Sequence, residues 1–277
     1  MSISSEFIKI VEKITSRIFI PQIKNIVIPK QKENVKKSNF AALILEDNSI
    51  GIFFINLRTE VKLLFKNFDS EAYKGMNPSF FAKKFESKDL FDKSLGLGAI
   101  NAIGQFIFKK CNFSFEYISD SLGLLEIEKH DTVGMVGFFP SLVNIIESKG
   151  NKLIVIEKKN HLLKKGKNWK VTLDPSKLEL CNKVLITSTT VLNETIDEIL
   201  QHCSNAEKVS MIGPTAGFLP DPLFAKGIDI IGGTQIKDTR LLIHSIRNNI
   251  RWGTSVKKYI IKRVDYIGYE NILKQLN

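Results

Sequence analysis

Residues 131–140 read Asp-Thr-Val-Gly-Met-Val-Gly-Phe-Phe-Pro, a short apolar run that breaks at glycines and restarts at a proline. The pattern predicts the first strand, turn and helix of a Rossmann-like sheet. Gly134 and Gly137 permit a tight turn and a close backbone approach, and the fixed φ of Pro140 suits the first position of a helix. The spacing G-x-x-G-x-x-P departs from the dinucleotide fingerprint G-x-G-x-x-G. Two interpretations stay open: a turn that holds a nucleotide or phosphate, and a turn that serves packing alone.

Strand and helix signals alternate after this stretch. A helix over 140–148 stops at Gly150, and a strand over 153–156 ends at Glu157. We expect further strands over 184–187, 209–212 and 228–231 and a polar loop over 161–175. From Lys237 onward we expect helix, interrupted near Gly253, which covers the sheet or contacts a second subunit in a homodimer. Such alternation is typical of a three-layer α/β domain with a mainly parallel sheet.

The first 92 residues predict a smaller unit. Ser4 or Ser5 can cap a helix with apolar positions from 7 to 18, and the ranges 40–45 and 50–55 form a hairpin around a four-residue loop. Helices are expected from Pro78 and, with many small residues, from Ser94 to about Lys110. We therefore expect an α+β domain over 1–92 and a Rossmann-like domain over 93–277.

Composition limits the class of protein. With 277 residues, 43% hydrophobic and 25% charged, the chain is globular and long enough for two domains. No apolar run reaches the roughly 18 uncharged residues of a membrane span, and a signal peptide is not expected either. Three widely spaced cysteines fit reduced thiols in a cytoplasmic protein.

The net charge of +11 comes mainly from lysine. Because readout of nucleic acid favours arginine, a partner of this kind is not expected, although a basic surface over Lys158–Lys170 stays open as a third possibility.

Three groups of polar residues are candidates for function. Glu157 lies about 20 residues beyond Gly137, where Rossmann domains place the acid that binds a ribose hydroxyl. The hydroxyls of residues 188–190, with Asn193 and Thr195, begin a helix and either bind a polar ligand or only cap it. Asn101 is an amide on an apolar helix face and needs backbone or ligand partners.

Other chemistry has little support. His130, His161, His202 and His244 show no metal-ligand spacing, and no catalytic triad, Walker A loop or HExxH motif occurs. A metal bound directly by side chains is therefore not expected, and neither catalytic residues nor a reaction type can be derived.

Four stretches, in this order, resemble one known family. They are 95–102, 134–140, 187–195 in the form T-x-T-T-x-x-N-x-T, and 213–215 continued by 219–220 and 227–229. Together they resemble the heavy-metal chelation family, domain of unknown function 364, in which an enolase N-terminal-like domain precedes a Rossmann-like one. The resemblance implies a cleft between the domains and a role in binding or making metal-chelating small molecules.

Carried onto this sequence, the resemblance implies the ligand-binding residues Asn101, Gly137, Phe138, Thr189, Thr190, Asn193, Gly213, Pro214 and Thr215. The family commonly has a glycine where this chain has Ser188, which would limit how closely a ligand approaches the backbone. We expect a small polar or anionic molecule to bind between the domains, in making or handling a heavy-metal chelator. The alternative is an oxidoreductase or transferase that uses a nucleotide cofactor through Gly134–Glu157.

Overall fold

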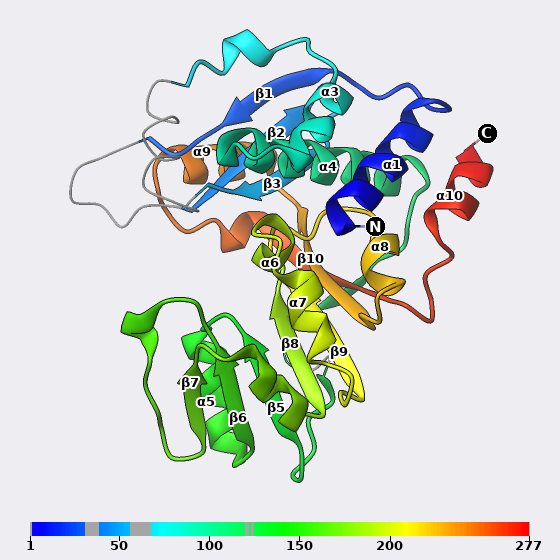
Figure 1. The fold of residues 1–277 in the computed structure, drawn as a ribbon. Helices are drawn as coiled ribbons and strands as arrows, with labels where there is room; N and C mark the ends of the chain where they lie inside the picture. The colour runs from blue at the N-terminus through cyan, green and yellow to red at the C-terminus, as the bar shows by residue number, and fades with distance from the viewer. Residues whose placement is uncertain (1, 31–38, 56–67, 120–121, 123–124, 277) are drawn as a thin grey trace.

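The computed structural model describes residues 2–30, 39–55, 68–119, 122 and 125–276. The chain forms two sheets, one of three strands and one of eight (Figure 1). The polar run over 30–38 predicts a loop, and most of it lies outside the described residues, as does part of the stretch 56–74, whose mixed pattern gives no prediction. Within the described ranges, none of the helices combines the length and apolar character needed to cross a membrane.

The small sheet is antiparallel, in the order β1-β2-β3, with β1 over Ile23–Val27, β2 over Phe40–Leu45 and β3 over Ile50–Phe54. The predicted hairpin is therefore confirmed. Helix α1 spans Ile3–Thr15, and its cap is Ser2, whose Oγ accepts the N–H of Ser5 at 3.2 Å. The prediction of Ser4 or Ser5 as the cap was wrong, because Ser4 lies buried inside the helix.

Short helical turns lead into the longest helix. They are η1 (Glu71–Tyr73), α3 (Pro78–Ala82) and η2 (Lys83–Glu86), and α4 follows over Leu90–Lys110. Asp89 caps α4, since its carboxylate accepts the N–H of Asp92, so the helix begins four residues before the predicted Ser94. The small residues of α4 allow close packing. A Cβ on Gly51 of β3 would lie 2.0 Å from the Gly98 carbonyl oxygen, and a Cβ on Gly98 would lie 2.5 Å from Cδ1 of Phe53, so glycine suits both positions.

The large sheet has the order β4-β11-β10-β9-β8-β5-β6-β7. Six consecutive strands are parallel: β10 (Ile230–Ile236), β9 (Lys208–Ile212), β8 (Lys183–Thr187), β5 (Thr132–Val136), β6 (Lys152–Ile156) and β7 (Trp169–Thr172). At one edge, β11 (Val256–Lys262) runs antiparallel to β10 and to β4 (Glu116–Ile118). The predicted α/β class, a small α+β unit followed by a mainly parallel sheet, is confirmed.

Helices and turns connect the strands. They are α5 (Pro140–Lys149), η4 (Asn160–Leu162), η5 (Pro175–Leu180), α6 (Thr189–Leu192), α7 (Ile196–Gln201), α8 (Asp221–Phe224), α9 (Thr239–Arg247), η6 (Gly253–Ser255) and α10 (Tyr269–Leu276). The predicted strand-turn-helix unit at 132–148 is therefore confirmed. The strand expected over 228–231 is confirmed as β10, although it runs from Ile230 to Ile236. Two predictions were wrong: part of the expected loop 161–175 is β7, and after the interruption expected near Gly253 the chain forms β11 before it returns to helix.

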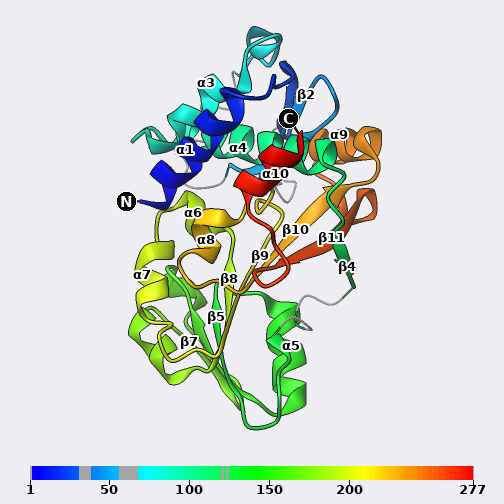
Figure 2. The same cartoon turned by 90° about the vertical axis from the view of Figure 1, so that its right-hand side faces the viewer.

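The end of the chain returns to the small domain. Leu242 and Ile246 of α9 pack in one apolar cluster with residues of β1, β2 and β3. The small sheet thus lies between α4 and α9 (Figures 1 and 2). The expected domain boundary, after residue 92, lies in the first turn of α4, a helix that packs against both parts, and it stays a prediction.

Candidate functional site

The strand order places a topological switch between β5 and β8. From β5 the chain moves outward through β6 and β7, and it then returns to β8 and moves the other way through β9 and β10. In open α/β sheets, ligands bind outside the carboxyl ends of the strands at such a switch. The loops that follow β5, β8 and β9 are neighbours there. We call residues 137–138, 187–190 and 213–215 the carboxyl-edge site.

Glycines let these three loops touch. A Cβ on Gly137, whose φ is +93°, would lie 3.2 Å from Cγ2 of Thr187, so the first and second loops are in contact. A Cβ on Gly213 would lie 1.9 Å from Oγ of Ser188, so the second and third loops pack directly against each other. The loops after β5, β8 and β9 therefore meet at one edge of the sheet.

The hydroxyl groups of the site form two layers. Ser188 and Thr215 are buried, and their hydroxyl oxygens lie 2.7 Å apart. Thr190 is also buried and donates its hydroxyl to the carbonyl of Thr187 at 2.7 Å. Thr187 and Thr189 are only half-buried, and their hydroxyl oxygens lie 2.7 Å apart. The last pair is thus the part of the hydroxyl cluster that is open to a ligand.

Asn101 joins the two domains behind this site. Its side chain is fully buried, and its Nδ2 donates to the Ile52 carbonyl of β3 at 2.8 Å and to the Thr215 carbonyl at 2.9 Å. The partners that the sequence required are therefore backbone groups, one from the small sheet and one from the loop that follows β9. Its Oδ1 is buried without a hydrogen-bond partner among the described residues.

Two further predicted residues have local structural partners. Asn193 is exposed, and its Oδ1 accepts the N–H and the hydroxyl of Thr195, at 3.2 and 2.6 Å, where α7 begins. These bonds form a local turn before α7. Neither α6 nor α7 has a side-chain cap hydrogen bond, so the capping interpretation that the sequence left open is not confirmed. Phe138 packs against Trp169, with ring centroids 6.0 Å apart, and Lys164 Nζ lies 4.0 Å from the Phe138 ring centroid.

Glu157 lies at the first loop, as its spacing from Gly137 predicted. Its carboxylate accepts the N–H of Phe138 at 2.9 Å and the N–H of Lys158 at 3.0 Å. A negative charge therefore already occupies a donor of the glycine turn, and Pro140 at the start of α5 has no N–H to offer. Both features reduce the number of N–H groups that this turn could donate to a phosphate, so they argue against a phosphate site here.

Sequence reasoning missed Lys93, a buried lysine of α4. Its Nζ lies 2.7 Å from the carboxylate of Glu194, in the connection between α6 and α7. The sequence contained a signal for a buried lysine, because Lys93 lies just before the apolar run of α4. It forms a second polar link between the small domain and the segment that carries Thr189.

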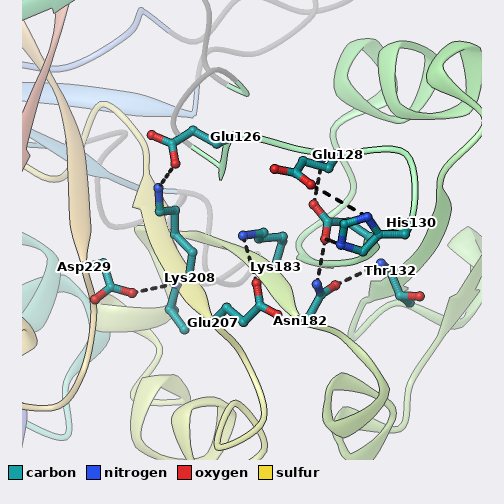
Figure 3. Close-up of polar contacts among 11 residues, drawn as sticks. Glu126, Glu128, His130, Thr132, Asn182, Lys183, Glu207, Lys208 and Asp229 are labelled. Carbon is teal, nitrogen blue, oxygen red and sulfur yellow. Dashed lines mark hydrogen bonds and ion pairs between the residues drawn. The ribbon is translucent and has the colours of Figure 1, made fainter.

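A polar network lies at the opposite, amino edge of the sheet (Figure 3). Asp131 is its buried centre: it accepts the N–H of Glu128 at 2.8 Å and the amide of Asn182 at 2.6 Å. Burial would raise the pKa of Asp131, but these hydrogen bonds outweigh it and hold the pKa below its ordinary value. Lys183 pairs with Glu207, and Lys208 with Glu126. Because this edge faces away from the switch, we interpret the network as structural.

The donor set does not suit direct binding of a heavy metal. Within the described ranges, no three His, Cys, Asp or Glu side chains gather in a way that could hold a metal ion. The three cysteines are free thiols. Burial raises the pKa of Cys181 to about 11 and that of Cys203 to about 12, so neither offers a thiolate at neutral pH. The carboxyl-edge site contains hydroxyl and backbone groups, whereas soft metals prefer thiolate and imidazole.

Fold and site together define an α/β protein with a small antiparallel sheet and a polar site at the switch of a larger, Rossmann-like sheet. Residues 120–265 match the family DUF364, described as "Putative heavy-metal chelation". The chain belongs to this family, and the resemblance read from the sequence is confirmed.

Three known proteins are similar to this chain. An uncharacterized protein of Methanocaldococcus jannaschii, MJ0500, is 31% identical over 164 residues, which cover 57% of this chain and 60% of the relative. A DUF364 structure from Desulfitobacterium hafniense has a TM-score of 0.68 at 20% identity and covers 93% of this chain and 98% of its own. A DUF364 structure from Pyrococcus horikoshii has a TM-score of 0.66 at 15% identity and covers 94% and 98%. Both structures, of unknown function, share the fold.

Proposed function

We propose that the carboxyl-edge site binds a small polar or anionic molecule, in the making or handling of a heavy-metal chelator. The observation that carries the proposal is the half-buried hydroxyl pair of Thr187 and Thr189 at the switch between β5 and β8. Chelators present anionic oxygens, which accept hydrogen bonds from hydroxyl and backbone donors. The metal in this proposal arrives as cargo, already held by the chelator.

A thermal-shift experiment tests this binding, because a ligand of the native state raises apparent stability. The probes are 2,3-dihydroxybenzoate and citrate, each alone and with ferric iron. We expect at least one probe to raise the unfolding temperature of the wild-type protein. Thr189→Val, which removes the hydroxyl while keeping the shape, should weaken that binding by about tenfold, the order of one lost charge-assisted hydrogen bond.

The matched control is Thr254→Val, at an exposed threonine of η6. It should bind like the wild type. The proposal fails if none of the probes shifts the wild-type protein, or if Thr189→Val responds as strongly as the control. Native mass spectrometry of freshly purified protein adds an independent readout, since a retained molecule would reveal its mass.

A nucleotide-cofactor enzyme is the second candidate, because Glu157 ends β6 beside the glycine turn of β5. In the same thermal-shift experiment, stabilisation by NAD(P) or S-adenosylmethionine alone would favour this alternative and exclude the first proposal. The occupied N–H of Phe138 makes that outcome the less expected one.

A further inference from the structure

A cationic hollow lies on α9, outside the carboxyl-edge site. The described residues that line it are Lys30, Arg240, Ile243, His244, Arg247 and Asn248, around a volume of about 410 Å³. No acidic side chain is among them. Three of the four basic side chains repeat at positions 240, 244 and 247, so they share one face of the helix. The opposite face of α9 packs on the small sheet through Leu242 and Ile246.

The position of Lys30 is fixed by backbone contacts. Its N–H donates to the Arg247 carbonyl at 3.0 Å, and its own carbonyl accepts the Asn249 amide at 2.5 Å. The end of the segment after β1 is thereby held against the C-terminal turn of α9. The hollow is therefore built from two segments that are far apart in the sequence.

An ordinary solvent-exposed face of α9 would not fully explain where these basic side chains lie. Arg247 lies in the last turn, where a cation complements the helix dipole, but Arg240 lies in the first turn, where the dipole disfavours a cation. Many lysines of this chain pair with carboxylates, whereas among the described residues neither Arg240 nor Arg247 has a carboxylate within 4.0 Å. Asp238 caps the helix through the N–H of Leu241 and does not line the hollow.

We propose that this hollow binds a small molecule with two or more phosphate groups. Guanidinium groups bind phosphate through two parallel hydrogen bonds, and the sequence places three of its six arginines within residues 240–251. Arg240 and Arg247 are seven residues apart, about 10 Å along a helix axis. An anion with charges along its length matches that spacing better than a single phosphate does. The volume lies within the range of small-molecule sites, about 300–1,000 Å³.

Isothermal titration calorimetry with sodium triphosphate tests the proposal on the full chain. The double variant Arg240→Gln, Arg247→Gln should bind triphosphate at least about tenfold more weakly than the wild type. Both side chains are exposed, so thermal unfolding of the double variant should match that of the wild type.

The control, Arg17→Gln with Lys152→Gln, also removes two positive charges, at exposed positions outside the hollow. Figures 1 and 2 place α1, which Arg17 follows, across the small domain from α9. The control should bind within about twofold of the wild type.

Other probes identify the chemistry. Citrate and inorganic phosphate should bind much more weakly than triphosphate. The proposal is overturned if the wild type does not bind triphosphate, if the control loses as much affinity as the double variant, or if citrate binds equally well and the double variant loses that citrate binding too. It is also overturned if a 20-base-pair DNA duplex binds far more tightly than triphosphate, with a steep salt dependence that the double variant removes, since the hollow would then serve nucleic acid.

Discussion

At the scale of single residues, partners distinguish a structural polar group from one that is open to a ligand. Asn101, Thr190 and Thr215 have buried protein partners, whereas Thr187 and Thr189 share one bond at a half-buried position. The sequence predicted that Asn101 needs partners, but it could not tell which, because they come from β3 and from the distant loop after β9. The sequence likewise identified Ser188 as unusual, but it could not show that the Ser188 hydroxyl packs directly against Gly213.

Asn101 provides the first residue-scale prediction. Asn101→Leu keeps a similar volume but leaves the Ile52 and Thr215 carbonyls without their donor, and each buried unsatisfied group costs about 1–3 kcal/mol. We expect the free energy of unfolding to fall by about 2 kcal/mol or more. Urea unfolding measures it, with Asn160→Leu as control, at an exposed asparagine of η4. Equal stability of the two variants would contradict the bridging role of Asn101.

At the scale of elements, hydrophobic periodicity identified the central strands and missed those at the edges. The strands β5, β6, β8 and β9 are buried apolar runs. In contrast, β11 contains Lys257, Lys258 and Lys262 around Tyr259, and β7 begins with Trp169 and Lys170 beside a basic loop. β7 is an edge strand, where lysines hinder pairing with other chains. β11 is second from the edge and is paired on both sides, but its lysines likewise hide the apolar pattern of a buried strand.

The contact between α4 and β3 gives the element-scale prediction. A Cβ on Gly51 would lie 2.0 Å from the Gly98 carbonyl oxygen and 2.4 Å from the Ala102 nitrogen, and backbone atoms cannot move aside as a side chain can. We expect Gly51→Ala to lower the free energy of unfolding by about 1–3 kcal/mol, the usual cost of overpacking. Gly253→Ala is the control, because a Cβ there has no neighbour within 4 Å among the described residues. A Gly51→Ala protein as stable as this control would refute the close packing.

At the scale of the whole molecule, the last segments of the chain join its parts. Lys13 of α1 lies 2.7 Å from both the Tyr269 hydroxyl and the Glu270 carboxylate of α10. These groups are exposed, so the pair adds little stability. The more buried link is Asp221 at the start of α8, which accepts the Tyr266 hydroxyl at 2.8 Å and the Tyr269 N–H at 2.9 Å. Such long-range contacts depend on the complete fold, which explains why local sequence patterns did not reveal them.

Asp221 makes the stability of this assembly depend on pH. Burial raises its pKa above the ordinary value of 3.8, more than the hydrogen bonds from Tyr269 and Tyr266 lower it. The folded state therefore binds more protons than the unfolded chain over a window that opens near pH 3.8, and rising pH lowers the free energy of unfolding across it. Asp221→Asn removes this penalty, so the unfolding temperature of the wild type should fall relative to the variant as pH rises from about 4.

Asp174→Asn should show the opposite trend. Hydrogen bonds from the Ser176 hydroxyl and from Lys177 lower the pKa of Asp174 and favour its charged form in the folded state. Thermal unfolding at a series of pH values measures both trends. If the unfolding temperature of the wild type instead rises relative to that of Asp221→Asn as the pH increases, the folded state stabilises the charged carboxylate of Asp221 beside α10, and the prediction is contradicted.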